Sequence, residues 1–488
     1  MNEPVRKLSV LILVMFLALM GAASWIQVVE AGSLNSDARN VRTLYREFGN
    51  YRGPFVVDGE SVVYSAAVND PFNYQRSYTA GELYAAATGY YSIVFGRTGL
   101  EQTENSLLAG TSDALFWNRL RDLLGGREQQ GASISLTLRA ALQQTAMDAL
   151  GDQVGAVVAI DPRTGAILAM VTSPTFDPAV LAGHDTSEVN DAYQALDADP
   201  NGPLINRAIA GDTYAPGSTF KLIVSAAALE AGYTPDSTVY APDELPLPGS
   251  TATIENYGGE SCGATDQITL EAALTISCNT AFADLGITLG WDVIERKAKE
   301  FGWTDTFRVP LVVTASRLPV NPDAAQTAMS SIGQFDVRAT PMQMAMVAAA
   351  IANDGKLMTP FIVDSARASD LSEIQKSVPV QYSTPLTIQE SAELTQMMVS
   401  VVNNGTGTAA KIPGVTVAGK TGTAETGLDT APHAWFVGFA PAENPVIAVA
   451  VIVENGGSIG SEATGGRVAA PIAKVVMQKA IELEGSAQ

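Results

Sequence analysis

The sequence predicts an α/β chain of the α+β type, in which an antiparallel sheet is combined with a mainly helical middle region. Two pairs of apolar, strand-like runs, at 156–171 and 434–453, are each joined by a short turn, which indicates antiparallel pairing. The long stretch between the pairs contains apolar residues at helical spacing. One uncharged run near the N-terminus is long enough to cross a membrane.

The composition limits the classes of function. The 488 residues include 29 Lys and Arg against 51 Asp and Glu, which gives a net charge of −22. Such a surface repels phosphates, so binding of nucleic acid by bulk electrostatics is excluded. A hydrophobic fraction of 47% is too high for a disordered acidic chain. The two histidines, His184 and His433, cannot form a three-histidine zinc site, and neither lies in a motif that suggests a Ser-His-Asp triad.

The first element is the uncharged run of 22 residues from Leu8 to Val29. A cleavable signal peptide is one interpretation, since 21–23 (Gly-Ala-Ala) resemble a cleavage site, but the run is longer than the usual apolar core of such peptides. Residues 1–29 are therefore expected to form a short tail and a transmembrane anchor. Arg6 and Lys7 place the tail in the cytoplasm and the rest of this single-pass chain outside the cell membrane.

A small module is expected at residues 30–130. It contains strand-like runs at 55–57 and 61–65, which are separated by Gly and Pro breaks. The polar stretch 125–131 (GGREQQG) indicates the boundary with a larger domain at 131–488.

Regular elements follow this boundary in order. The first four are a strand at 133–138, a helix at 139–150 and strands at 156–160 and 166–171. Near the C-terminus, strands at 434–439 and 446–453 precede a closing helix at 469–484.

Ser218 and Lys221 form the first motif with chemical meaning, in the segment 216–221 (PGSTFK). If Ser218 opens a helix, the two side chains lie one turn apart on the same face. The residues that follow are apolar all round, so the helix should be buried. Lys221 is then either a lysine whose ammonium reaches water along a packed stem, or a desolvated amine that takes a proton from Ser218.

The second motif is Ser277-Cys278-Asn279, which follows a helical stretch at 270–276. On its own it is weak, because a polar turn after a helix often has this composition.

The third motif is Lys420-Thr421-Gly422-Thr423, which follows a strand-like run. We expect an edge strand whose glycine lets a substrate backbone approach closely. Lys420 and the threonine hydroxyls would then offer positive charge and hydrogen bonds to a carboxylate. A solvated edge strand that carries a lysine is the alternative.

In this order, the three motifs resemble the Ser-x-x-Lys, Ser-x-Asn and Lys-Thr-Gly set of penicillin-binding proteins and active-site serine β-lactamases. Nearly the whole chain is similar to class B penicillin-binding proteins, most clearly at 155–160, 164–171, 331–334, 405–410 and 434–439. The resemblance implies an antiparallel five-stranded sheet flanked by helices, an all-helical subdomain, and a dimerisation or pedestal module at 30–130.

The resemblance also implies a peptidoglycan D,D-transpeptidase that needs no cofactor and no metal. Ser218 would attack the D-Ala-D-Ala amide of one stem peptide, with Lys221 as its base. Ser277 would relay a proton to the leaving amine, and Asn279 would hold the substrate amide. An amine of a second stem peptide would then release the acyl group as a cross-link.

Lys420 would shape the electrostatics of the same site. The substrate-binding residues would be Thr421, Gly422 and Thr423, and the backbone amides of Ser218 and Thr423 would form the oxyanion hole. The implied partners are peptidoglycan stem peptides, β-lactams that acylate Ser218, the membrane, and a SEDS-family glycan polymerase with other division or elongation proteins.

Four other functions compete with this one. A bifunctional class A enzyme would need a glycosyltransferase domain, for which the roughly 100 residues between the anchor and position 131 leave too little room. A β-lactamase would turn over penicillin rapidly, and no water-activating group can be identified. A non-catalytic β-lactam sensor or scaffold would not need Ser218. A D,D-carboxypeptidase would differ only in its acceptor.

Cys262 and Cys278 are the whole cysteine complement. Outside the cytoplasm they can form a disulfide, which would stabilise the fold by about 3 kcal/mol and tether the second motif. Two separate buried thiols are the alternative.

Overall fold

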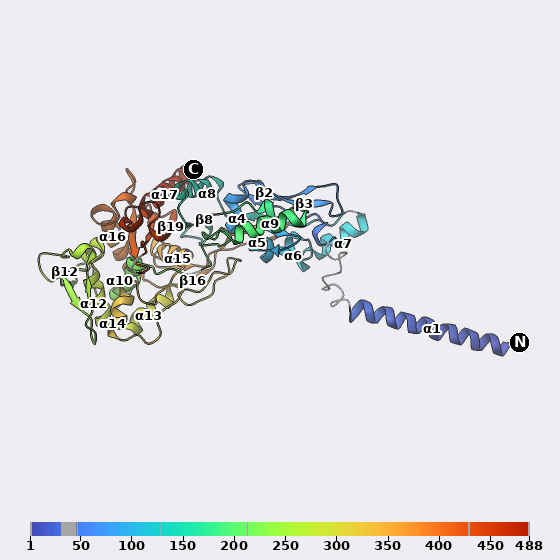
Figure 1. Cartoon of the computed structure of the whole chain (residues 1–488), viewed down its shortest axis with the longest axis horizontal. Helices are drawn as coiled ribbons and strands as arrows, with labels where there is room; N and C mark the ends of the chain where they lie inside the picture. Colours follow the sequence, from blue (N-terminus) through green and yellow to red (C-terminus); the bar gives the residue numbers. More distant parts are fainter. Residues whose placement is uncertain are drawn as a thin grey trace.

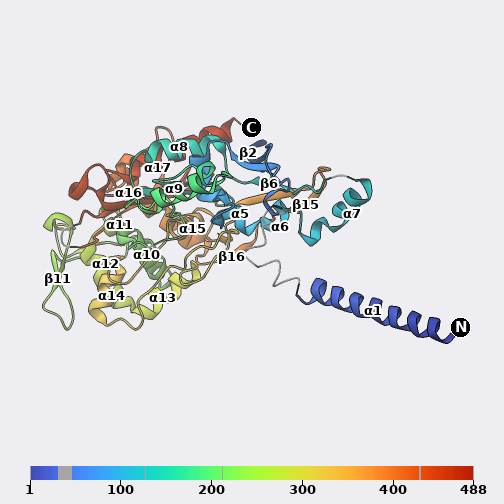
Figure 2. The ribbon, with the colours of Figure 1, turned by 45° about the vertical axis from the view of Figure 1, so that its right-hand side comes forward.

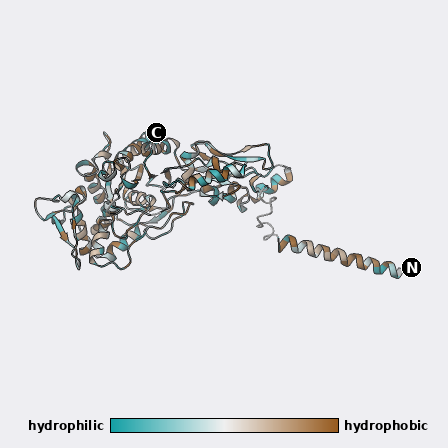
Figure 3. Cartoon of the chain, in the orientation of Figure 1, coloured by the Kyte–Doolittle hydropathy of each residue, from teal (hydrophilic) through white to brown (hydrophobic). Residues whose placement is uncertain are grey.

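A computed structural model describes residues 2–30, 45, 47–126, 128–211, 213–427 and 430–486. Residues 31–44 of the expected pedestal module and Arg127 of the expected boundary lie outside the described residues. Helix α1 (Asn2–Val28) stands apart from the rest and is exposed, and it is mainly hydrophobic after its polar N-terminal end (Figures 1 and 3). Among the described residues, it is the one helix long and apolar enough to span a membrane.

The N-terminal module is built on a sheet whose described strands follow the order β15-β14-β6-β1-β2-β3. The meander β1 (Phe55–Val57), β2 (Glu60–Ala67) and β3 (Tyr74–Tyr78) is antiparallel, whereas β1 pairs in parallel with β6 (Ser133–Leu136). Strands β14 (Val363–Arg367) and β15 (Glu373–Lys376) complete the sheet from far along the chain. Strand β1 pairs on one edge with β2 and on the other edge with β6, which follows the predicted boundary near residue 130. Backbone hydrogen bonds therefore cross this boundary.

Short elements follow β3 along the chain. They are α4 (Gly81–Thr88), β4 (Tyr91–Ser92), β5 (Gly96–Arg97), α5 (Gly99–Thr103), α6 (Asn105–Leu108), η1 (Asp113–Leu115) and α7 (Phe116–Gly125).

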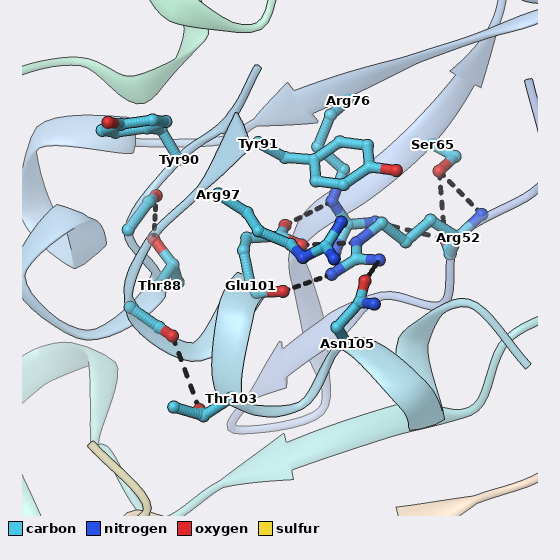
Figure 4. Close-up of polar contacts among 12 residues, drawn as sticks. Arg52, Ser65, Arg76, Thr88, Tyr90, Tyr91, Arg97, Glu101, Thr103 and Asn105 are labelled. Atoms are coloured by element: carbon cyan, nitrogen blue, oxygen red, sulfur yellow. Dashed lines mark hydrogen bonds and ion pairs between the residues drawn. The ribbon is translucent and has the colours of Figure 1, made fainter. Parts of the chain in front are cut away.

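A buried ion cluster ties the sheet to α5 (Figure 4). The Glu101 carboxylate accepts hydrogen bonds from Arg52 Nε at 2.5 Å and from Arg76 Nε at 2.6 Å. Arg52 also donates to Asn105 Oδ1 at 2.6 Å. Burial alone raises the pKa of Glu101, but the two arginines outweigh it and lower this pKa below its usual value. The carboxylate therefore stays ionised inside the module.

The second sheet contains, within the described residues, five strands in the order β17-β18-β19-β7-β8, and every neighbouring pair is antiparallel. Their bounds are β7 (Gly155–Ile160), β8 (Ile167–Ser173), β17 (Ala418–Ala424), β18 (His433–Ala440) and β19 (Ile447–Val453). The predicted five-stranded antiparallel sheet is thus confirmed.

Helices bury both faces of this second sheet. Along β19, Val449 and Val451 point to one core and Ala450 and Ile452 to the other, as the two-residue period of a strand requires. Helix α15 (Pro341–Ala352) packs on one face, and α17 (Ala469–Gly485) with α8 (Ala140–Leu150) packs on the other. The predicted helices at 139–150 and 469–484 are confirmed.

The middle of the chain is mainly helical, as predicted. Its helices are η2 (Pro178–Leu181), α9 (Thr186–Asp197), η3 (Gly217–Phe220), α10 (Lys221–Glu230), η4 (Tyr257–Gly259), α11 (Leu270–Ile276), α12 (Asn279–Leu289), α13 (Trp291–Glu300), α14 (Ala324–Ser331) and α16 (Ile388–Asn404). Its short strands are β9 (Thr238–Tyr240), β10 (Glu244–Pro246), β11 (Thr253–Glu255), β12 (Gln267–Thr269), β13 (Leu357–Met358) and β16 (Gln381–Ser383). The remaining short turns are η5 (Thr408–Ala410), η6 (Glu454–Gly456) and η7 (Gly460–Glu462).

Candidate active site

The turn that carries Ser218 packs against the strand that carries the third motif. Gly217 has a φ of 52°, and a Cβ at this position would lie 2.7 Å from the carbonyl oxygen of Thr423. Its N–H donates to the Gly333 carbonyl at 3.0 Å. Only glycine fits both this backbone conformation and this close approach. Ser218 follows directly, half-buried, in the 3-10 turn η3.

Lys221 is the first residue of α10 and is fully buried. Its Nζ donates to the Ser277 carbonyl at 2.7 Å and to Asn279 Oδ1 at 2.8 Å, and lies 3.3 Å from Ser277 Oγ. The first and second motifs are therefore in direct contact. The alternative in which the ammonium reaches water is wrong, because the surrounding apolar helix encloses the whole side chain.

Ser277 terminates α11 in the left-handed conformation, with φ 63° and ψ 40°. A residue with a side chain adopts this conformation at a cost of about 1–3 kcal/mol, which the surrounding structure must offset. The result is that the Ser277 carbonyl faces Lys221 while its hydroxyl oxygen accepts a hydrogen bond from Lys420 Nζ at 2.8 Å. One hydroxyl thus lies between two lysine side chains.

Lys420 lies on β17 and is also fully buried. Besides the contact with Ser277, its Nζ donates to the Thr421 carbonyl at 2.9 Å. The alternative of a solvated lysine on an edge strand is therefore wrong. Strand β17 is nevertheless the edge of the five-stranded sheet in the described part of the chain, as predicted.

Burial determines the electrostatics of the two lysines. It lowers the pKa of Lys420 to about 7. Burial, and then the charge of Lys420, lower the pKa of Lys221 well below its usual value. Two ammonium groups beside one hydroxyl repel each other, which favours the loss of one proton from the pair. A neutral amine next to the Ser218 turn can accept a proton.

The other predicted residues of β17 make contacts of their own. The hydroxyl oxygens of Thr421 and Thr406 lie 2.5 Å apart, and Thr423 Oγ1 accepts a hydrogen bond from Gly465 N at 3.4 Å. At Gly422, a Cβ would lie 2.9 Å from the Pro216 carbonyl oxygen. The Ser218 turn therefore lies against the strand at this glycine, and the approach of a substrate backbone along β17 stays a prediction.

Asn256 is a site residue that the sequence does not reveal. Its Oδ1 accepts hydrogen bonds from the backbone N–H of Asn279 at 2.9 Å and of Thr280 at 3.1 Å, so it caps α12. The Asn279 side chain in turn donates to the Glu255 carbonyl at 3.2 Å. A single asparagine in a loop more than twenty residues before the motif has no spacing or periodicity that would single it out.

Cys262 and Cys278 form a disulfide, with a Cα–Cα distance of 5.9 Å. This confirms the predicted bridge and contradicts the alternative of two thiols. Cys278 precedes Asn279 directly, so the bridge ties the loop after β11 to the second motif.

We expect removal of this bridge by Cys262→Ser with Cys278→Ser to lower the free energy of unfolding by about 3 kcal/mol, since the unfolded chain regains the freedom of a loop of this length. Chemical denaturation of the variant and the unaltered protein, each with and without reductant, measures the change. Reductant should destabilise only the unaltered protein. An equal response of both would contradict the prediction.

Neither histidine contacts the lysine pair. His184 Nδ1 lies 2.6 Å from Asp70 Oδ2 in the N-terminal module. His433, at the start of β18, accepts a hydrogen bond from Asn455 N at 3.1 Å and packs against Tyr214. The basic groups of this site are therefore lysines.

Comparison with known families agrees with this geometry. Residues 155–478 match the family described as the penicillin-binding protein transpeptidase domain, and residues 52–134 match the penicillin-binding protein A dimerisation domain.

Curated relatives are similar over their full length. The peptidoglycan D,D-transpeptidase PbpA of Mycolicibacterium smegmatis is 44% identical, with 100% of both chains covered. PbpA of Mycobacterium tuberculosis is 43% identical, over 99% of this chain and 100% of the relative.

Solved structures show the same fold. The ceftriaxone acyl-enzyme of M. tuberculosis penicillin-binding protein A is 43% identical and superposes with a TM-score of 0.86 over 90% of this chain and 100% of that one. Its penicillin G acyl-enzyme is 44% identical, with a TM-score of 0.84 over 88% and 100%. With its three motifs gathered around two buried lysines, this chain belongs to the penicillin-binding protein transpeptidase family.

Proposed function

We propose that the protein is a peptidoglycan D,D-transpeptidase that works through an acyl-enzyme on Ser218. The observation that carries the proposal is the Ser277 hydroxyl, which lies between the buried Lys221 and Lys420 beside the Ser218 turn. The relatives named peptidoglycan D,D-transpeptidase and the β-lactam acyl-enzymes of the M. tuberculosis protein support this chemistry.

In the first half-reaction, Ser218 Oγ attacks the carbonyl carbon between the two D-alanines of a donor stem peptide. Its proton passes to the neutral Lys221 amine. The C–N bond then breaks, and the terminal D-alanine leaves with a proton that Ser277 delivers from the lysine pair. Asn279 holds the substrate amide. The contacts of Lys221 Nζ with Ser277 Oγ and Asn279 Oδ1 support the relay from Lys221 to Ser277.

Charge develops on the attacked carbonyl oxygen, and the backbone N–H groups of Ser218 and Thr423 stabilise it. One donor of this kind contributes about 3–4 kcal/mol to lowering the barrier. Lys420 supplies positive potential, while Thr421 and Thr423 bind the terminal carboxylate. Gly422 allows the strand to lie close enough to the Ser218 turn for both amides to act together.

In the second half-reaction, the amine of another stem peptide attacks the ester carbonyl and expels Ser218, which takes back its proton. The new amide is the cross-link of the cell wall. A β-lactam acylates Ser218 in the same way, but its opened ring remains attached to the acyl group and blocks the site.

Product analysis tests this function. A donor stem peptide on lipid-linked glycan, supplied with and without an acceptor amine, should give a cross-linked product when the amine is present. Release of D-alanine with water as the sole acceptor would identify a D,D-carboxypeptidase instead. Rapid release of hydrolysed penicillin, in place of a long-lived adduct, would identify a β-lactamase.

The proposal includes the arrangement at the cell membrane. From Leu8 onward, helix α1 is a single-pass anchor, and the residues before Leu8 are the cytoplasmic tail. Residues 30–130 are a pedestal, and residues 131–488 are the transpeptidase domain outside the membrane. The length and hydropathy of α1 and the basic residues Arg6 and Lys7 support this orientation. The pedestal contacts a membrane glycan polymerase, with which the enzyme serves growth and division. Removal of the pedestal should abolish this association.

Asn256 offers a test of how the second motif is positioned. We expect Asn256→Ala to slow acylation by labelled penicillin about 10-fold, because two buried N–H groups lose their acceptor and Asn279 shifts away from Lys221. The rate of adduct formation, followed on a gel, measures the effect.

Asn256→Asp is the matched variant, since it keeps an oxygen that accepts both hydrogen bonds. It should retain most of the acylation rate. If both variants acylate as fast as the unaltered protein, Asn256 caps the helix without positioning the motif.

A further inference from the structure

Helix α7 presents its apolar residues to solvent instead of to the protein. Phe116 is 50% exposed, Trp117 71%, Leu123 77% and Leu124 81%, and none of the helix's described residues is buried. These four residues and Leu120 recur at the spacing of a single helical face. Figure 3 shows hydrophobic residues on this helix, at the edge of the module.

The polar side of α7 is the side that holds it to the protein. Arg119 Nη1 donates to the Thr111 carbonyl at 2.8 Å. Asn118 and Arg121 both donate to Asp370, which lies next to β15, at 3.3 and 2.7 Å. Polar contacts therefore orient the apolar face outward. The neighbouring Leu371, which is 78% exposed, extends this face.

The apolar face lies close to where the chain leaves its anchor. In both Figure 1 and Figure 2, α7 is at the end of the molecule nearest α1. Positions 28 and 47 are 19 residues apart, so the chain between them can span at most about 65 Å. Gly53 N–H donates to the Leu108 carbonyl at 2.8 Å, which brings the entry of the module beside the residues that lead into α7.

We infer that α7 is a second membrane contact, a helix that lies in the lipid surface with Phe116, Trp117, Leu123 and Leu124 among the acyl chains. Tryptophan and phenylalanine on one face, with arginines on the other, are typical of interfacial helices. The only charged residues of α7 are two arginines and one aspartate, so it meets anionic lipid without the repulsion that the chain's net charge of −22 creates elsewhere.

This inference rests on the proposed anchoring by α1, and it implies that the protein contacts the membrane at two places. A chain held by one helix and a linker can rotate over the membrane, whereas two contacts restrict the direction in which the pedestal holds the transpeptidase domain. The lipid contact of α7 thus sets the orientation of the active site relative to the bilayer.

The test uses the full chain in vesicles that contain phosphatidylglycerol. Because the native cysteines are bridged, Leu124→Cys provides a single thiol for a nitroxide label. Val320→Cys is the matched control, since Val320 is an exposed valine of the transpeptidase domain. We expect a water-soluble nickel chelate to reach the label at position 124 at least about 5-fold less than the label at position 320, and oxygen to reach it more.

Equal access of the nickel chelate to both labels overturns the lipid contact. Protection at position 124 that appears only when a glycan polymerase is added to the vesicles also overturns it, and identifies the face as a protein-docking surface. Retention of the chain in the vesicles after a carbonate wash reports on α1, and penicillin capture by the labelled protein reports on the enzyme. Failure of α7 is thereby separated from failure of the anchor or of the catalytic site.

Discussion

Replacement of Ser218 by alanine is expected to abolish covalent capture of labelled penicillin completely. The adduct is an ester of the Ser218 hydroxyl. The other hydroxyl of this turn, that of Thr219, is fully buried and donates to the Pro216 carbonyl at 2.7 Å. Lys221 and Lys420 would remain in place, but they would have no nucleophile to activate. A gel with fluorescent penicillin measures the adduct, and the mass of the intact protein confirms its absence.

Ser225→Ala is the matched control for this experiment. Ser225 lies on α10 one turn after Lys221, is fully buried, and has a hydroxyl without a hydrogen-bond partner among the described residues. Its removal should leave capture unchanged, which shows that α10 tolerates the loss of a hydroxyl. An adduct of full yield on Ser218→Ala would contradict both the assignment of the nucleophile and the proposed mechanism.

Much of the transpeptidase sheet could be predicted from the sequence, because four of its strands, β7, β8, β18 and β19, are mainly apolar runs of their own. The runs at 156–160 and 446–453 became β7 and β19 with ends that moved by one residue. The pairing of the other sheet could not be predicted. Strand β6 was expected to follow the boundary as part of the larger domain, yet it pairs with β1, and a short strand does not reveal which distant edge it will join.

The residues of the site also fall into those that the sequence could predict and those that it could not. Lys221 stood out in the sequence because a lysine at the start of an apolar helix is costly to bury. Ser218 and Lys420 were expected from the order of the three motifs and their resemblance to a known set. The left-handed conformation of Ser277 and the cap by Asn256 could not be predicted, because both depend on how helices α11 and α12 meet. The contact of the Ser218 turn with Gly422 could not be predicted either, since the sequence does not show which segment packs against this glycine.

Replacement of Lys221 by methionine is expected to slow acylation by penicillin by a factor of about 10²–10⁴, which is the range that a general base contributes. Methionine fills much of the space of the lysine stem without a titratable group. The variant also leaves the Ser277 carbonyl and Asn279 Oδ1 without their donor, so a slower rate alone would not separate a base from a structural contact.

The pH dependence of the acylation rate distinguishes a general base from a structural contact at Lys221. Since burial and Lys420 lower the pKa of Lys221, the acylation rate of the unaltered protein should rise with pH and level off well below pH 10.5, once Lys221 has lost its proton. Lys221→Met should lack this rise. Lys297→Met is the control for burial, because Lys297 is also buried and donates to the Pro385 carbonyl at 2.7 Å, away from the motifs. It should keep both the rate and the rise. If Lys221→Met keeps the rise as well, the proton of Ser218 goes to Lys420, whose pKa of about 7 would make it the remaining base.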